Sequence, residues 1–183
     1  LEMVSVDIPA LRDDEVLIKV IAASICGTDL HIYKWNPWAE ERIKRLPLII
    51  GHEFAGRIIE VGKGIRGFSV DDYVSADSHI VSGGCLQCKI GQQHICSNLQ
   101  ILGVDRDGCF AEYVAIPSRG VWKNDASMPP EFASVQDPLG NALYCTLVEP
   151  VTGKSVLIIG DGPIGLFAAG IARDSGASWI GLI

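Results

Sequence analysis

A glycine-rich hexapeptide late in the chain restricts the possible folds more than any other stretch. Its sequence, Gly160-Asp161-Gly162-Pro163-Ile164-Gly165, matches the pattern G-x-G-x-x-G. An apolar run (155–159) precedes it, a helix-forming run (166–175) follows, and a second apolar run (179–183) comes next. This order predicts a βαβ unit, the context in which the pattern carries meaning.

The three glycines of this loop are candidate cofactor-binding residues. Gly160 permits the tight turn, Gly162 lets the backbone approach a pyrophosphate, and Gly165 lets the helix pack on the strand. The helix N-terminus adds N–H donors and the positive end of its dipole. The alternative is a plain strand-to-helix turn. The acidic residue that grips the ribose is expected about 20 residues beyond the loop, at or past Ile183, so NAD and NADP both stay open.

Two separated motifs supply a possible metal ligand set. Cys26 follows a β-rich run over residues 15–24, and His52-Glu53 stands between two apolar runs. A thiolate, an imidazole and a carboxylate that converge can hold Zn²⁺, and three protein ligands with one open position define a catalytic site. The alternative is a core histidine beside a surface glutamate, with Cys26 as a small buried hydrophobe. We favour the metal site because both motifs occur together.

Short β-rich runs separated by glycine turns recur before residue 120, which is typical of a barrel-like β domain. They cover residues 15–24, 48–50, 54–61, 73–76 and 111–116. Another expected strand lies at residues 3–9, and residues 28–33 suit a short helix or turn. We therefore predict a mixed β and α/β protein with a domain at 1–150 and a second domain starting near Val151, at 151–183. The apolar runs at both ends lead us to expect a fragment of a longer chain.

A polar lobe between residues 78 and 98 contains a second possible zinc site. Cys85-Leu86-Gln87-Cys88 is a CxxC pair and Cys96 follows it. A closed site needs four ligands, and the fourth cysteine of this rhythm falls on position 82, where Ser82 stands. His79 or His94 could substitute for it. The alternative is a zinc-free lobe, and a redox CxxC is disfavoured because no βαβ pattern surrounds it.

Composition excludes several partners. The formal net charge of −7 argues against nucleic acid and anionic membranes as partners. The longest apolar stretch, 156–172, is broken by Asp161 and Pro163 and makes a poor membrane span. No export signal opens the sequence, and six cysteines without one suggest a reducing compartment. We expect a cytoplasmic protein that acts on small molecules.

Together these motifs resemble the zinc-dependent medium-chain dehydrogenases. The residues that carry the resemblance are 26–33, Trp35, Trp38, 51–53, 108–113 and 137–142, together with the glycine loop. The resemblance implies a GroES-like β-barrel catalytic domain followed by the start of a Rossmann cofactor domain, with the active site in the cleft between them. It also implies a homo-oligomer, usually a tetramer.

The resemblance assigns roles residue by residue. It implies Cys26, His52 and Glu53 as catalytic zinc ligands, with Thr28 and His31 as a proton relay. The other implied roles are an acidic ligand or relay near the zinc (Asp137), a cofactor contact (Ile164), a substrate-pocket histidine (His79) and three ligands of a structural zinc (Cys85, Cys88, Cys96). Ser82 departs from the family pattern.

The implied activity is hydride transfer from a secondary alcohol to NAD, with the 3-hydroxyl of L-threonine as the first substrate expected. Zinc would act on the substrate hydroxyl as a Lewis acid, and the alcohol proton would leave through Thr28 and His31. One alternative is a polyol, butanediol or other secondary-alcohol dehydrogenase. Another is a zinc-binding fragment without catalytic activity.

Overall fold

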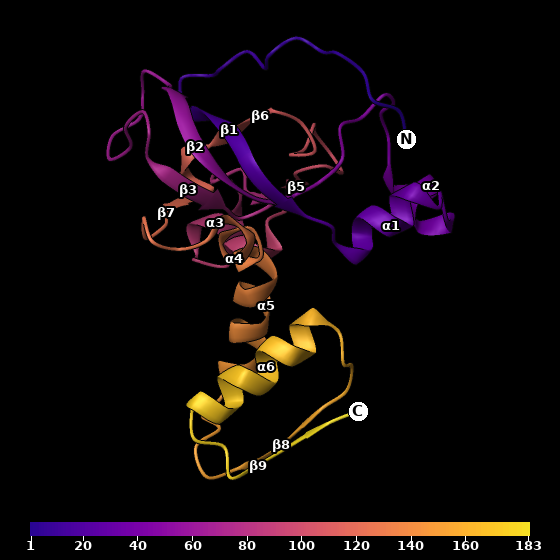
Figure 1. The fold of residues 1–183 in the computed structure, drawn as a ribbon, viewed down its shortest axis with the longest axis vertical. Coiled ribbons are helices and arrows are strands. Elements are labelled where there is room, and N and C mark those ends of the chain that lie inside the picture. Colours follow the sequence, from indigo (N-terminus) through magenta and orange to yellow (C-terminus); the bar gives the residue numbers. More distant parts are fainter. The chain divides into compact units, whose positions relative to one another are not determined.

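The computed structural model describes all residues from 1 to 183, and they form two compact units (Figure 1). The first comprises Leu1–Ser134 and the second Val135–Ile183. The sequence placed the boundary near Val151, whereas the structure divides the chain before helix α5 (Gln136–Leu147). The division comes earlier because α5 packs against helix α6 (Pro163–Asp174), and such tertiary packing leaves no local sequence signal.

The first unit is built on a five-stranded antiparallel sheet in the order β6-β1-β2-β3-β7. Its strands are β1 (Glu15–Ser24), β2 (Glu53–Val61), β3 (Tyr73–Ala76), β6 (Tyr113–Pro117) and β7 (Val121–Lys123). The long pairing of β1 with β2 is interrupted by two register shifts, between Leu17 and Ile18 and between Val20 and Ala22. Such irregularities increase the local twist of a sheet. The barrel-like β architecture predicted from the short runs is thus present, with β6 and β7 as its two edges.

One apolar cluster holds this sheet together. Fully buried side chains from β1, β2, β3 and β6 meet in it, among them Ile18, Phe54, Ile58, Val74 and Ile116. Full burial of a side chain of this size stabilises the fold by about 1.5–3 kcal/mol. The cluster fixes β1 against β2, the two strands on which the candidate site depends.

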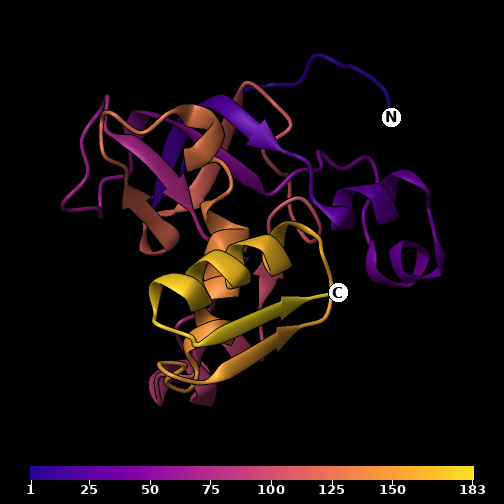
Figure 2. The ribbon, with the colours of Figure 1, turned by 60° about the horizontal axis from the view of Figure 1, so that its bottom comes forward.

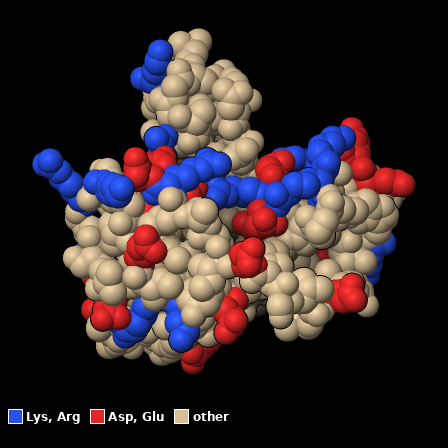
Figure 3. Space-filling model, turned by 90° about the horizontal axis from the view of Figure 1, so that it is seen from above, with Lys and Arg blue, Asp and Glu red and all other residues tan.

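Shorter elements surround the sheet. They are α1 (Gly27–Tyr33), α2 (Pro37–Arg42), α3 (Leu86–Lys89), α4 (Pro130–Ala133), β4 (His79–Ile80), β5 (Gln100–Ile101), and two 3₁₀ turns, η1 (Gln93–Ile95) and η2 (Ser118–Gly120). A second apolar cluster, including Ile32, Ala39 and Ile43, packs α1 and α2 against the chain that leads to β2. On the face drawn in Figure 3, acidic and basic side chains are interspersed.

Two predicted strands are wrong. Residues 3–9 form no helix or strand, and Met3, Val4, Val6 and Ile8 are exposed. A strand needs a partner for its backbone groups, and no other segment pairs with this one. Residues 48–50 also form no strand, although Ile50 is buried in the second cluster.

The second unit contains the predicted βαβ arrangement. Strands β8 (Ser155–Ile158) and β9 (Trp179–Leu182) pair in parallel, and α6 connects them (Figure 2). Pro163 occupies the first turn of α6, where its missing N–H costs nothing. The helix therefore begins three residues before the predicted run at 166–175. No helix in either unit has the length and apolar character that crossing a membrane requires.

Gly165→Ala is expected to destabilise the second unit by about 2 kcal/mol, the usual cost of overpacking. A Cβ at this position would overlap the carbonyl oxygen of Gly160 and push α6 away from β8. The N–H of Gly160 donates to the carbonyl of Ile183, and the N–H of Ile183 donates to that of Ile158. Hydrogen exchange at these two amides should accelerate. The matched control is Gly170→Ala in the same helix, where a Cβ meets nothing and should slightly stabilise the helix. Equal exchange rates in the two variants would contradict the packing role of Gly165.

Candidate metal centre

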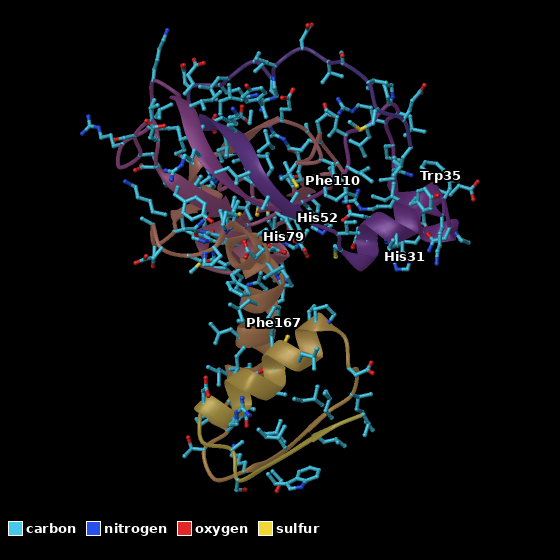
Figure 4. All side chains as sticks on the ribbon, in the orientation of Figure 1. His31, Trp35, His52, His79, Phe110 and Phe167 are labelled. Atoms are coloured by element: carbon cyan, nitrogen blue, oxygen red, sulfur yellow. The ribbon has the colours of Figure 1, made fainter.

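The antiparallel pairing of β1 with β2 brings the two predicted ligand motifs together. Ser24, the last residue of β1, stands opposite Glu53, the first residue of β2. Cys26 lies just beyond the end of β1, and His52 lies just before the start of β2 (Figure 4). The donor atoms of Cys26, His52 and Glu53 all lie within 4.8 Å of one another. One ion could therefore contact all three.

Two of these three side chains are buried, and a hydrogen bond orients one of them. His52 and Glu53 are buried, and Cys26 is partly exposed. The Ser24 hydroxyl donates a hydrogen bond of 2.7 Å to Oε2 of Glu53. A buried carboxylate is costly unless it is paired, hydrogen-bonded or bound to a metal. The donor set and its spacing therefore fit a zinc ion held by three protein ligands.

Asp29 was not predicted as part of the site. Its buried carboxylate accepts the backbone N–H of Cys26 through Oδ2 at 2.9 Å. Its Oδ1 lies 3.6 Å from Nδ1 of His52, and neither of these two atoms has a hydrogen-bond partner. A carboxylate beside one ring nitrogen is the usual second layer behind a metal-bound histidine, and it leaves Nε2 for the ion. The only sequence signal was an acidic residue three positions after the cysteine, which reads equally well as a helix-capping residue.

The charges around the site shift the pKa values of two of its candidate ligands. The pKa of the Cys26 thiol is lowered, first by the neighbouring imidazole of His52. Burial lowers the pKa of His52, but Asp29 and then Cys26 outweigh it and raise that pKa to about 10. Without metal, His52 is therefore protonated at neutral pH, and the Cys26 thiol loses its proton more readily than a free cysteine does. Binding of a cation through the imidazole must release the histidine proton, so affinity should rise with pH.

The predicted relay residues lie on α1, which follows directly from the end of β1 (Figure 1). Oγ1 of Thr28 lies 3.8 Å from Sγ of Cys26, so this hydroxyl borders the candidate metal position. His31 is exposed, and its Nδ1 lies 2.9 Å from Nδ2 of Asn36. Asn36 was not predicted to have a role.

The predicted pocket histidine and the predicted acidic residue lie on other elements. His79 is in β4, where Nδ1 lies 3.2 Å from Oδ1 of Asp77. Asp137 lies in the first turn of α5, in the second unit. Cys109, which the sequence left as a packing residue, is buried, and its Sγ lies 3.6 Å from the backbone oxygen of Glu53. Burial raises the pKa of this thiol, so it stays protonated and is a poor ligand.

The polar lobe gathers its three thiols around one point. Sγ of Cys85 lies 3.4 Å from that of Cys88 and 3.7 Å from that of Cys96. Ligands on a tetrahedral zinc with bonds of about 2.3 Å stand about 3.8 Å apart. Backbone N–H groups, first that of Cys88, lower the pKa of Cys85 to about 6, so one thiolate is present without metal. This spacing fits three corners of a tetrahedral site.

Ser82 lies beside the three thiols, where a fourth ligand would be needed. Its Oγ lies 3.4 Å from Sγ of Cys96 and 4.0 Å from Sγ of Cys88. The cluster of thiols includes neither His79 nor His94, so neither histidine replaces the missing cysteine. A neutral hydroxyl is a much weaker zinc ligand than a thiolate, and the lobe as it stands is a three-thiol site with a weak fourth corner.

Ser82→Cys is expected to complete this site. A thiol at this position would add a fourth thiolate to those of Cys85, Cys88 and Cys96, so zinc content should rise by about one ion per chain under chelator competition. The apparent melting temperature should rise with it, because a structural zinc stabilises the fold that binds it. Ser82→Ala is the control and should bind no more zinc than the unaltered chain. Unchanged zinc content in Ser82→Cys would contradict the tetrahedral arrangement.

The glycine loop borders an open hollow of ≈ 570 Å³ within the second unit. Its walls are β8, the loop and the start of α6, with Cys145 and Thr146 at one side. Gly160 has φ of 117°, a conformation that side chains rarely adopt, and Gly162 caps α6. Gly160, Gly162, Ile164 and Gly165 all line the hollow. The loop therefore presents its backbone and the helix N-terminus to an open space.

The fold and the convergence of these ligands indicate the class of protein to which the chain belongs. Residues 12–128 match the family described as the alcohol dehydrogenase GroES-like domain, and the chain belongs to this family. Among curated proteins it is 57% identical over 176 residues to the L-threonine 3-dehydrogenase of Pyrococcus abyssi, covering 96% of this chain and 50% of that protein. The chain thus spans about half the length of the curated relatives it matches.

Solved structures agree with this assignment. A zinc-binding dehydrogenase from Sinorhizobium meliloti 1021, solved with NADP, has a TM-score of 0.88 and 34% identity, covering 97% of this chain and 51% of that chain. The 2R,3R-butanediol dehydrogenase of Bacillus subtilis has a TM-score of 0.85 and 27% identity, covering 99% of this chain and 54% of that chain. The resemblance to zinc-dependent medium-chain dehydrogenases is confirmed.

Proposed function

We propose that this protein is a zinc-dependent L-threonine 3-dehydrogenase. The observation that carries the proposal is the convergence of Cys26, His52 and Glu53 within 4.8 Å in a chain 57% identical to an L-threonine 3-dehydrogenase. These three side chains would hold the catalytic zinc, which when bound supplies a Lewis acid to the substrate hydroxyl. Asp137 is proposed as an acidic group near that zinc, and His79 as a wall of the substrate pocket.

Thr28 and His31 are proposed to move the hydroxyl proton. The Thr28 hydroxyl borders Cys26, and His31 lies one helical turn further along α1, where it is exposed. A hydroxyl followed by an imidazole can pass a proton from a buried position to solvent. Both residues lie on one short helix, so their spacing is set by the helix itself.

The glycine loop is proposed to bind the dinucleotide, with Gly160, Gly162 and Gly165 at the pyrophosphate and Ile164 against the cofactor. We propose NAD as the cofactor, with NADP as the alternative. The three-thiol lobe (Cys85, Cys88, Cys96) is proposed to hold a second zinc more weakly than a four-cysteine site. A homotetramer in the cytoplasm stays a prediction.

The test is NADH formation by the zinc-loaded protein with L-threonine, 2R,3R-butanediol or sorbitol as the alcohol. The proposal predicts the highest kcat/KM with L-threonine. Turnover confined to the diol or the polyol would instead identify the alternative dehydrogenase. Absence of turnover, with no change in NADH fluorescence on mixing, would favour a zinc-binding module without catalysis.

A further inference from the structure

The turn between α1 and α2 places Asn36 directly against His31. Trp35, two residues after the end of α1, adopts a left-handed conformation (φ 47°). Its N–H donates to the carbonyl of Ile32 at 3.0 Å. The N–H of Asn36 then donates to the carbonyl of His31 at 3.3 Å. These two bonds form a Schellman motif, which usually requires glycine at the left-handed position. A tryptophan in this conformation destabilises the fold by roughly 1–2 kcal/mol relative to glycine.

The orientation of the Asn36 amide is fixed by the helix that it caps. Its Oδ1 accepts the N–H of Ala39 at 3.0 Å and thereby caps the N-terminus of α2. The reversed amide would set its NH₂ group against that N–H and lose a cap that stabilises a helix by about 1 kcal/mol. Nδ2 is therefore the atom that faces Nδ1 of His31, at 2.9 Å.

The identity of this atom decides where the proton of His31 resides. An amide nitrogen only donates hydrogen bonds, so Nδ1 of His31 must accept. In the neutral imidazole, the proton then lies on Nε2. The ring of Trp38 also lies near the imidazole of His31, with the two ring centroids 6.1 Å apart and an interplanar angle of 57°.

We propose that Asn36 is a positioning residue for His31, fixing both the orientation of the ring and the tautomer that carries its proton on Nε2. The importance of this for catalysis rests on the proposed relay. In neutral His31, the Nε2 proton is then the one available for donation, and Nδ1 can take up a proton only if its contact with Asn36 breaks. Asn36 thereby sets which end of the imidazole gives a proton and which receives one.

Two substitutions separate this role from simple capping, because Asp and Ser both cap helices well. In Asn36→Asp, the carboxylate can only accept a hydrogen bond, so Nδ1 of His31 should carry the proton. In Asn36→Ser, the cap remains but the shorter side chain does not reach His31, so both tautomers should be populated. Thermal unfolding checks that both variants fold.

The readout is two-bond ¹H–¹⁵N correlation NMR on the chain labelled with ¹⁵N-histidine, recorded at alkaline pH where the ring is neutral. Four histidines give few signals, and His31→Gln assigns those of His31. The unaltered chain should show a pyridine-type Nδ1 and a pyrrole-type Nε2, and Asn36→Asp should reverse them. A protonated Nδ1 or a tautomer mixture in the unaltered chain would overturn the proposal. So would an unchanged tautomer in Asn36→Asp.

This experiment needs neither alcohol nor dinucleotide. A chain that forms no NADH but shows the expected tautomers would lose the proposed dehydrogenase function and keep the role of Asn36. A chain that oxidises L-threonine but shows the opposite tautomer would keep the proposed dehydrogenase function and lose the role of Asn36.

Discussion

Cys26→Ala is expected to remove about one zinc ion per chain, with zinc affinity at the site reduced at least 100-fold. Loss of a partner behind a ligand already costs 10–100-fold, and this change removes a ligand itself. His52 and Glu53 alone leave the ion with too few protein donors for a stable site. Zinc content by atomic absorption after mild chelation measures the effect, and any dehydrogenase activity should fall in parallel.

The fold should survive this substitution. The bond from the Cys26 backbone N–H to Asp29 does not depend on the side chain, and Cys26 is only partly buried. Cys145→Ala is the matched control, because Cys145 is an exposed free cysteine outside both thiol-containing ligand sets. If both variants retain the zinc content of the unaltered chain, Cys26 is not a ligand.

Gly51→Ala is expected to destabilise the first unit by about 3 kcal/mol and to impair zinc binding as well. Gly51 has φ of 91°, and a Cβ there would overlap the ring of Phe110. Left-handed strain and overpacking each cost about 1–3 kcal/mol. Because His52 is the next residue, any backbone shift that relieves the clash also moves a metal ligand. Urea unfolding followed by zinc titration measures both effects.

Gly67→Ala separates the two causes. Gly67 has φ of 88°, but a Cβ there meets nothing, so this variant should lose only about 1 kcal/mol from strain. The double variant Gly51→Ala with Phe110→Ala removes the ring from the clash and should lose less stability than the two single variants summed. Equal losses in Gly51→Ala and Gly67→Ala would show that Phe110 does not restrict this position.

The sequence predicted what local patterns determine. The β-rich run at 15–24 is the strand β1 with the same bounds, and the glycine loop lies between a strand and a helix as its spacing indicates. These features depend on residues adjacent in the chain. The failed strand at residues 3–9 has the same local pattern, but strand formation also needs a pairing partner that the pattern cannot reveal.

The candidate site could be predicted only in part, because its residues come from segments that are distant in the sequence. Cys26 and His52-Glu53 stand out as residue types, and only the register of β1 on β2 brings them together. Ser24 and Asp29 were missed because a serine at a strand end and an aspartate in a first turn have ordinary local explanations. Their contacts with Glu53 and His52 arise from pairing between distant segments.

Anomalous diffraction at the zinc absorption edge, on crystals of the zinc-loaded protein, would locate the ion relative to Cys26 and His52. If these residues hold the catalytic zinc, a peak is expected about 2.3 Å from Sγ of Cys26 and about 2.0–2.1 Å from Nε2 of His52. A zinc peak found only among Cys85, Cys88 and Cys96, with none between Cys26 and His52, would contradict this assignment.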